Sequence, residues 1–320
     1  SFQAAVYLSL DILCFTKKFM TGEAKIMKQR FLRGVLLIVA AATAWGMGGV
    51  AGQYLFQNYH ADAVWLVMVR QIIAGFLFLL FAKLMQKQDV FRILREDLKA
   101  IVAFSFIGVL GAQLGFYHTI SLCNAATATV LQYMAPVFVM LWMSIKKKSL
   151  PEGREFLGIF FAVAGVFLIS THGNLDKVVL SPAALAVGIY SAIAYAYYTV
   201  MPAELLKKYP STVVIGWGQL LSGLGLVFFR NPVALPTGWD NHAVLAFLYL
   251  LFGATIASYS LYLAGLKIVG PTKASLISCA EPLASIIAVV VLLGTVLTME
   301  DLIGMGCIIF TVLMLSLPKK

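Results

Sequence analysis

Long apolar runs separated by short polar connectors fill this chain from residue 34 onward. The runs are apolar all round a helix rather than on one face, which is typical of helices surrounded by lipid. Most of them are long enough to cross roughly 30 Å of hydrocarbon at about 1.5 Å per residue. The pattern predicts ten transmembrane helices, over residues 34–55, 64–81, 101–121, 125–145, 156–171, 182–200, 213–229, 244–266, 274–293 and 302–317.

The overall composition favours the same environment. Hydrophobic residues make up 61% of the 320 residues and charged residues only 12%, whereas ordinary soluble domains contain roughly 25% charged residues. A water-soluble protein of this length has no interior large enough to hide so many apolar side chains. The class predicted is therefore an all-α integral membrane protein.

The positive charge is distributed unevenly among the connectors. Of the 24 lysines and arginines, 21 lie before the first run, after the last run, or in every second connector. The remaining connectors hold only Lys177 and Arg230, and Arg70 falls inside a run. Because cytoplasmic loops of membrane proteins are enriched in Lys and Arg, this distribution predicts ten spans with both termini in the cytoplasm. It also accounts for the net charge of +10 without a nucleic-acid partner.

The first 30 residues differ from the rest. Residues 2–15 are apolar but short and are interrupted by Asp11, so they make a poor membrane span. No basic region precedes them, so they also make a poor signal peptide. Met27 stands before a basic cluster and the first clean apolar run, and we expect it near the functional start. Residues 1–30 are interpreted as an N-terminal extension without an assigned role.

The first five runs and the last five resemble each other. Pro136 and Pro282 are 146 residues apart, and several further pairs share offsets of 145 to 148, namely Ala128/Ala274, Thr129/Ser275, Gly158/Gly304, Ser170/Ser316, Gln71/Gln219, Gly75/Gly223 and Tyr117/Tyr262. Two copies of five spans must cross the membrane in opposite orientations. The predicted architecture is thus ten transmembrane helices as two inverted five-helix repeats, over residues 31–171 and 172–320, with ten unrelated helices as the alternative.

Short motifs then connect the chain to a known family. They are Ala44-Trp45-Gly46 in the first span, Arg70 in the second, Tyr117 before the fourth, Pro136 in the fourth and Glu281-Pro282 in the ninth. With the five-plus-five plan, residues 31–317 resemble the EamA-like branch of the drug/metabolite transporter superfamily. The resemblance implies export or exchange of amino acids, other metabolites or drugs without ATP hydrolysis. Ala135 stands where the first repeat would match Glu281, so a mechanism that needs two paired carboxylates is in doubt.

Two charged residues inside the spans are the main candidates for chemistry. A carboxylate within a membrane is costly unless it is neutralised or paired, so Glu281 is predicted to bind protons or to contact the solute. The alternative is a structural role, in which Glu281 bonds to helix backbone freed by Pro282. Arg70 could hold a substrate carboxylate through two parallel hydrogen bonds. Its alternatives are an ion pair with Glu281 or a position near a helix end from which it reaches the headgroups.

Weaker candidates are polar, aromatic or proline residues in the spans. Gln71 and its repeat partner Gln219 are predicted to form a polar pair near the repeat interface. Trp45 and Tyr195 lie near the middle of matching first helices and are expected to line a cavity or, equally, to pack. The remaining candidates are His118 and Gln132 as polar groups of the site, and Pro136 and Pro282 as hinges.

Several kinds of function are disfavoured by what the sequence lacks. It contains no phosphate-binding GxxxxGK[ST] loop, no HExxH metal motif and no GxSxG nucleophile motif, so neither a metal nor another cofactor is predicted. The hypothesis is a secondary transporter, not an enzyme, that exports amino acids or related metabolites by alternating access.

The remaining expectations concern location and rival functions. We expect the bacterial inner membrane, with a small-molecule solute and the lipid bilayer as partners, and leave open a homodimer. The rival hypotheses are a transporter of sugar phosphates or nucleotide sugars, an intramembrane enzyme and a non-transporting scaffold.

Overall fold

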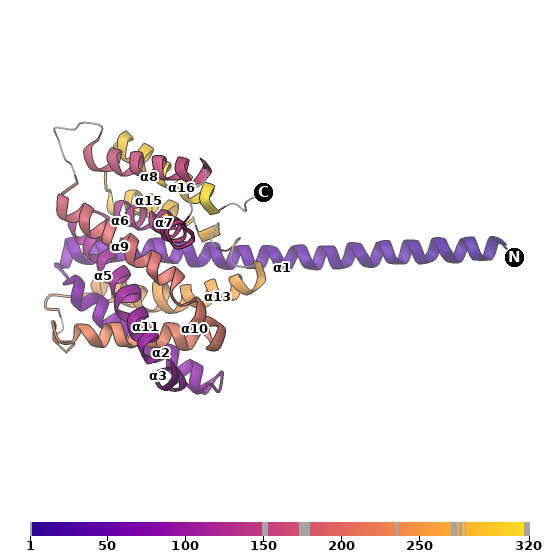
Figure 1. Ribbon diagram of the computed structural model, residues 1–320, viewed down its shortest axis with the longest axis horizontal. Coiled ribbons are helices and arrows are strands. Elements are labelled where there is room, and N and C mark those ends of the chain that lie inside the picture. The colour runs from indigo at the N-terminus through magenta and orange to yellow at the C-terminus, as the bar shows by residue number, and fades with distance from the viewer. Residues whose placement is uncertain are drawn as a thin grey trace.

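The computed structural model of the protein describes residues 2–148, 153–172, 180–233, 236–269, 274, 277–278 and 280–316. Side chains are described from residue 29 onward, apart from 143, 146, 147, 154, 155, 315 and 316. All regular elements in these described ranges are helices, and they form one bundle (Figure 1).

Six helical segments are long and apolar enough to cross a membrane. They are Gln29–Tyr59, Ala63–Leu84, Leu98–Leu122, Ala125–Trp142, Pro182–Lys208 and Asn241–Val269. The other four predicted spans coincide with the shorter helices α8 (Gly153–Thr171), α11 (Ser211–Leu226), α15 (Ala280–Leu293) and α16 (Met299–Ser316). The multi-pass helical membrane fold is therefore confirmed, while the count of ten spans stays a prediction.

The first helix differs from its prediction. The sequence suggested a boundary near residue 31, but α1 is one continuous helix over Phe2–Tyr59. Its C-terminal part runs through the middle of the bundle, where it packs against α13 (Ser258–Val269), α15 and α6 (Ala125–Gln132), and its N-terminal part projects away from the bundle (Figure 1). The helix is uninterrupted because residues 16–33 contain neither proline nor a cluster of turn residues.

Helix starts follow from local capping residues. Asp62, Asn124 and Ser181 each accept a hydrogen bond from a backbone N–H in the first turn of α2 (Ala63–Leu84), α6 and α9 (Pro182–Val200) respectively. Asp240 does the same for α12 (Asn241–Leu248). Such caps satisfy donors that have no partner within the helix, so they define where four of the spans begin.

Two predicted spans contain π-helical segments. The third consists of α4 (Leu98–Ala103), η1 (Phe104–Leu110) and α5 (Gly111–Leu122). The eighth consists of α12, η2 (Tyr249–Ala257) and α13. The two π-helical segments begin 145 residues apart, which is the offset that relates Tyr117 to Tyr262. Such segments are rare and occur frequently at functional sites, and nothing in the apolar pattern predicts them.

The contact between α2 and α11 has two-fold symmetry. A Cβ atom on Gly75 would lie 2.4 Å from the backbone nitrogen of Leu220, and one on Gly223 would lie 2.9 Å from that of Ile72. Residues 72 and 220 are 148 apart, as are residues 75 and 223. Each repeat therefore presents the same surface to the other, and the two helices run antiparallel.

The fifth and last predicted spans, α8 and α16, meet in the same way. A Cβ atom on Gly165 would lie 2.6 Å from the carbonyl oxygen of Gly304, and one on Gly304 would lie 2.7 Å from that of Gly165. The hydroxyl of Thr311 donates to the carbonyl of Gly158 over 3.2 Å. Gly158 corresponds to Gly304, and Gly165 to Thr311, at an offset of 146. The Gly165–Gly304 contact and the Gly158–Thr311 contact are therefore related by an internal two-fold axis.

Candidate functional site

Arg70 lies on α2 in the interior and is held by residues of two helical elements, α5 and η2. Its Nη1 donates to the hydroxyl of Tyr117 over 3.1 Å and to Oγ1 of Thr255 over 3.3 Å, and its Nη2 donates to Gln113. The guanidinium carbon lies 4.5 Å from the centre of the Tyr117 ring. The side chain is only 5% exposed, and its Nε has no hydrogen-bond partner. Arg70 is thus a buried, fixed cation with a donor free to bind an oxygen acceptor.

Glu281 lies in the first turn of α15, on the other side of α1. Its Oε2 accepts a hydrogen bond of 2.9 Å from the hydroxyl of Tyr133, which also donates to the carbonyl of Ser278 over 2.9 Å. A Cβ atom on Gly46 would lie 2.7 Å from the carbonyl oxygen of Glu281. The Trp45-Gly46 motif of α1 therefore packs directly on the Glu281-Pro282 motif of α15, and the missing side chain at residue 46 permits the approach.

The two charged groups do not pair with each other. Among the described residues, no ion pair joins Arg70 to Glu281. Tyr117 and Tyr259 each interact electrostatically with both Arg70 and Glu281. The predicted alternative of an Arg70–Glu281 ion pair is therefore wrong. The Arg70 side chain is buried against α5 and η2, while its depth relative to the headgroups stays a prediction.

Aromatic side chains lie near these two charged residues. The ring of Trp45 lies 5.3 Å from the rings of Tyr259 and Tyr262. The rings of Tyr195 and Tyr198 stack at 5.6 Å, and Tyr198 interacts electrostatically with Tyr259. All five are only partly buried although they lie between helices of both repeats. The structure thus brings the candidates Trp45, Tyr195, Arg70 and Glu281 into one region, which we call the central cluster.

Gln71 and Gln219 lie beside the central cluster, at the α2–α11 contact. The hydroxyl of Ser222 donates to Oε1 of Gln71 and to the backbone carbonyl of Gln219, both over 2.8 Å. Gln71 is 1% exposed, and its Nε2 has no partner. The two glutamines are buried where the repeats meet, with Ser222 joining the Gln71 side chain to the Gln219 backbone.

Gln132 and His118 are placed elsewhere. The Nε2 of Gln132 donates to the carbonyl of Ala112 over 3.1 Å and to the hydroxyl of Ser191 over 2.8 Å, so this side chain joins α6 to α5 and α9. His118 is exposed on α5. The structure does not bring His118 to the central cluster, because its position on α5 faces away from Gln113 and Tyr117.

The two prolines lie next to the ends of helices. The fourth predicted span is two helices, α6 and α7 (Ala135–Lys147), with Pro136 in the first turn of the second. Proline is tolerated there because its missing N–H would have no partner in any case. Pro282 occupies the first turn of α15. The break before Pro136 places Tyr133 where it reaches Glu281.

Three functional candidates were not predicted as such. Gln113 and Thr255 bind Arg70, and Tyr133 binds Glu281. A glutamine within an apolar run was a usable signal for Gln113. Thr255 carried none, because its position depends on the π-helical turn in which its hydroxyl bonds to the carbonyl of Leu250, five residues earlier.

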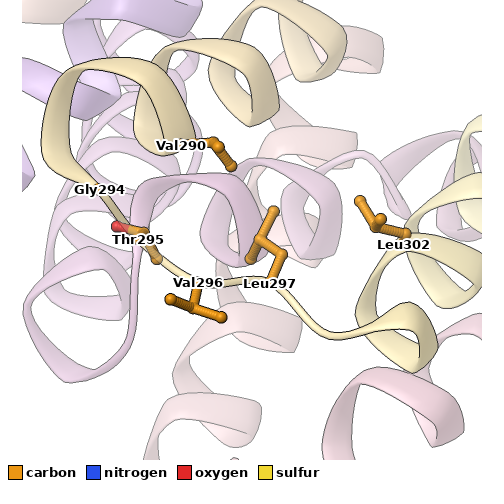
Figure 2. Close-up of a pocket in the computed structure, with 6 residues that line it drawn as sticks. All are labelled: Val290, Gly294, Thr295, Val296, Leu297 and Leu302. Carbon is orange, nitrogen blue, oxygen red and sulfur yellow. The ribbon is translucent and has the colours of Figure 1, made fainter.

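A separate cavity of ≈ 390 Å³ lies where α15 ends and α16 begins. Figure 2 shows Val290, Leu297 and Leu302 around it, with the Thr295 side chain beside Gly294. Its lining is mostly apolar and contains none of the charged or aromatic residues of the central cluster. This cavity is therefore distinct from the candidate site.

The bundle is apolar, consists of two symmetric halves and holds the charged residues Arg70 and Glu281 in its interior. These features are typical of a multi-pass membrane transporter. The EamA-like transporter family model matches the chain twice, over residues 32–171 and 182–317. The chain belongs to the EamA-like transporter family. The first match covers one set of five predicted spans and the second match covers the other.

Relatives that are matched along nearly their whole length support this membership. The chain is 36% identical over 290 residues to the inner membrane transporter YicL of Salmonella typhimurium, covering 90% of this chain and 96% of YicL. It is 22% identical over 301 residues to the riboflavin transporter ImpX of Fusobacterium nucleatum, covering 89% and 98%. One solved crystal structure shares the fold with a TM-score of 0.58 at 17% identity, covering 90% of this chain and 96% of that one.

Proposed function

We propose that this protein is a secondary transporter that exports amino acids or related small metabolites by alternating access around the central cluster. The observation that carries the proposal is the presence of Arg70 and Glu281 beside the same tyrosines without an ion pair between them. Opposite charges left apart in a buried region are costly. A solute that carries both a carboxylate and an ammonium group would neutralise both.

The side chains around the charges fit such a solute. Arg70 retains an unpartnered Nε donor for a carboxylate. Glu281 and the partly exposed rings of Trp45, Tyr259 and Tyr262 suit an ammonium group through charge and cation–π attraction. Sugar phosphates would require several cations, whereas Arg70 is the one cation of the central cluster among the described residues.

Orientation and location belong to the same proposal. The distribution of lysine and arginine supports cytoplasmic termini. The similarity to YicL, named as an inner membrane transporter, supports the inner membrane. Export rather than uptake is the direction that the family resemblance implies.

The proposal predicts that cells producing the protein release a small set of solutes. Solutes in the medium are measured for cells with the intact protein, with Glu281→Gln, with His118→Gln or with no protein, at equal abundance in the membrane. Riboflavin is included because one relative is named for it. We expect release by the intact protein and by His118→Gln, whose side chain is exposed. Release by Glu281→Gln should be at least roughly tenfold less, since a hydrogen bond to a charged group contributes about 1.5–3 kcal/mol. Equal release by Glu281→Gln and the intact protein would reduce Glu281 to a structural role.

A further inference from the structure

Two tyrosine–aspartate contacts connect the repeats at opposite ends of the bundle. In the first, the Tyr209 hydroxyl donates to Oδ2 of Asp97 over 2.7 Å and Lys208 Nζ lies 3.0 Å from Oδ1 of Asp97. In the second, the Tyr59 hydroxyl donates to Oδ1 of Asp240 over 2.7 Å. We call these the 97–209 latch and the 59–240 latch.

The latches occupy equivalent positions in the two repeats. Asp97 directly precedes α4, and Asp240 directly precedes α12, the helices that begin the third and eighth predicted spans. Tyr209 precedes α11 by two residues, and Tyr59 precedes α2 by four. Each latch therefore joins the chain before the second span of one repeat to the chain before the third span of the other.

The two latches lie at opposite ends of the antiparallel pair α2 and α11. The side chains of Thr212 and Gln86 bond over 2.6 Å at the end that holds the 97–209 latch. Arg230 and Asp62 form an ion pair of 2.9 Å at the other end. Because α2 has 22 residues, the ends are separated by roughly 30 Å, which is the thickness of the hydrocarbon core.

Each latch leads through a π-helical segment to the central cluster. Beyond Asp97, the chain continues through α4 and η1 to Gln113 and Tyr117, which bind Arg70. Beyond Asp240, it continues through α12 into η2, where Thr255 binds Arg70. Both latches are therefore connected along the chain to groups that hold the same arginine.

We propose that the two latches are alternating gates, so that opening the 97–209 latch exposes the central cluster at one membrane face while the 59–240 latch keeps the other face closed. The proposal rests on the transport function proposed above. Both latches consist of polar side chains at helix ends or on the adjoining connectors, where the hydrogen bonds can break while the spans stay folded. They are unequal, because Tyr209 also donates to Glu96 over 3.0 Å and is 5% exposed, whereas Tyr59 is only half-buried.

The latches should be insensitive to pH across the physiological range. The hydrogen bond from Tyr209 and the charge of Lys208 lower the pKa of Asp97, and the backbone N–H of Ala243 with the Tyr59 hydroxyl lowers that of Asp240. A carboxyl whose folded pKa is depressed contributes stability above its usual pKa, about 4, and loses it as the pH falls through the folded value. His242 also interacts electrostatically with Asp240, but the Asp240 carboxylate stays ionised in this range and keeps the hydrogen bond from Tyr59. We expect amide exchange at both ends, corrected for its intrinsic pH dependence, to be constant from about pH 5 to pH 8 and to rise below about pH 4.

Hydrogen–deuterium exchange of the full chain in lipid nanodiscs tests the gates without any solute. Tyr209→Phe removes one hydroxyl and should raise the opening equilibrium at the start of α4 about tenfold, the effect of one hydrogen bond to a charged group. Because the two ends cannot be open at once, more frequent opening at the 97–209 end should leave the 59–240 end open less often, and exchange at the start of α12 should slow. Tyr59→Phe should do the reverse, and the double variant should restore the balance between the two ends.

Further variants distinguish a gate from a local structural contact. Asp97→Asn and Asp240→Asn should each reproduce the effect of the tyrosine variant at the same latch. Asparagine at residue 240 preserves the helix cap, and the Asp97 side chain makes no cap hydrogen bond that could be lost. Tyr190→Phe, at a 54% exposed tyrosine of α9, should leave both ends unchanged. Exchange that changes only at the substituted end, with no opposite change at the other, would overturn the proposal. This readout does not depend on the solute, so it separates failure of the gates from failure of the proposed transport function.

Discussion

Replacement of Arg70 by leucine is expected to abolish transport while leaving the folded protein at least as stable as before. The guanidinium is 5% exposed and makes three hydrogen bonds, to Tyr117, Thr255 and Gln113. If Arg70 also binds the solute carboxylate, its loss removes a charge-assisted contact of about 3 kcal/mol, which corresponds to a decrease in transport of roughly 100-fold. Leucine also removes a charge that is costly inside a membrane, so thermal unfolding in detergent should not occur at a lower temperature.

The lysine variant tests the geometry of the arginine. Arg70→Lys keeps the charge but loses the planar fork, which a point charge on a flexible stem does not replace. We expect transport intermediate between the intact protein and Arg70→Leu. Uptake of labelled solute into proteoliposomes, with the melting temperature of each variant measured on the same sample, provides both quantities. Normal transport by Arg70→Leu would assign Arg70 to structure alone.

Substitution of Gly75 by valine is expected to prevent assembly of the two repeats. A Cβ atom at Gly75 would lie 2.4 Å from the backbone nitrogen of Leu220 and 2.8 Å from the carbonyl oxygen of Gly216. Real Cβ atoms do not approach backbone atoms so closely, so α2 and α11 would have to separate. Overpacking of a close contact costs typically about 1–3 kcal/mol or more, and here the loss extends along the whole helix pair. We expect Gly75→Val to lower the melting temperature strongly or to abolish the folded protein.

Two further glycines provide a second test of this prediction and a matched control. Gly223→Val introduces the symmetric clash with Ile72 and should have an effect of similar size. Gly306→Val is the matched control, because a Cβ atom at this glycine of α16 would meet nothing within 4 Å. Size-exclusion profiles and melting temperatures of the three variants in one detergent provide the comparison. Equal stability of Gly75→Val and Gly306→Val would show that the α2–α11 contact is loose.

The membrane fold was predictable from local chemistry alone. Apolar runs of sufficient length require a lipid environment, and no tertiary contact is needed for that inference. The same holds for the repeat, since the 148-residue offset of Gln71/Gln219 and Gly75/Gly223 is visible in the sequence and reappears in the symmetric α2–α11 contact. Arg70 and Glu281 were identifiable as candidate site residues because a charge in an apolar run is costly and usually has a structural or functional role.

Other features depended on how the helices pack in three dimensions. Whether Arg70 and Glu281 form a pair could not be read from residues more than 200 positions apart, and the structure separates them with tyrosines from both repeats. The π-helical turns that bring Thr255 to Arg70 leave no mark in the hydrophobic period, because they shift backbone bonds rather than residue types. His118, polar within an apolar run like Gln113, lies on the exposed face of α5.

By itself, the sequence determined that this protein crosses the membrane as helices in two related halves, because burial of apolar residues is a property of each segment. Only the tertiary structure decided which polar groups meet. Hydrogen bonds such as those of Arg70 with Gln113 and Thr255, or of Tyr209 with Asp97, form only when donor and acceptor atoms from distant parts of the chain come within about 3 Å of each other.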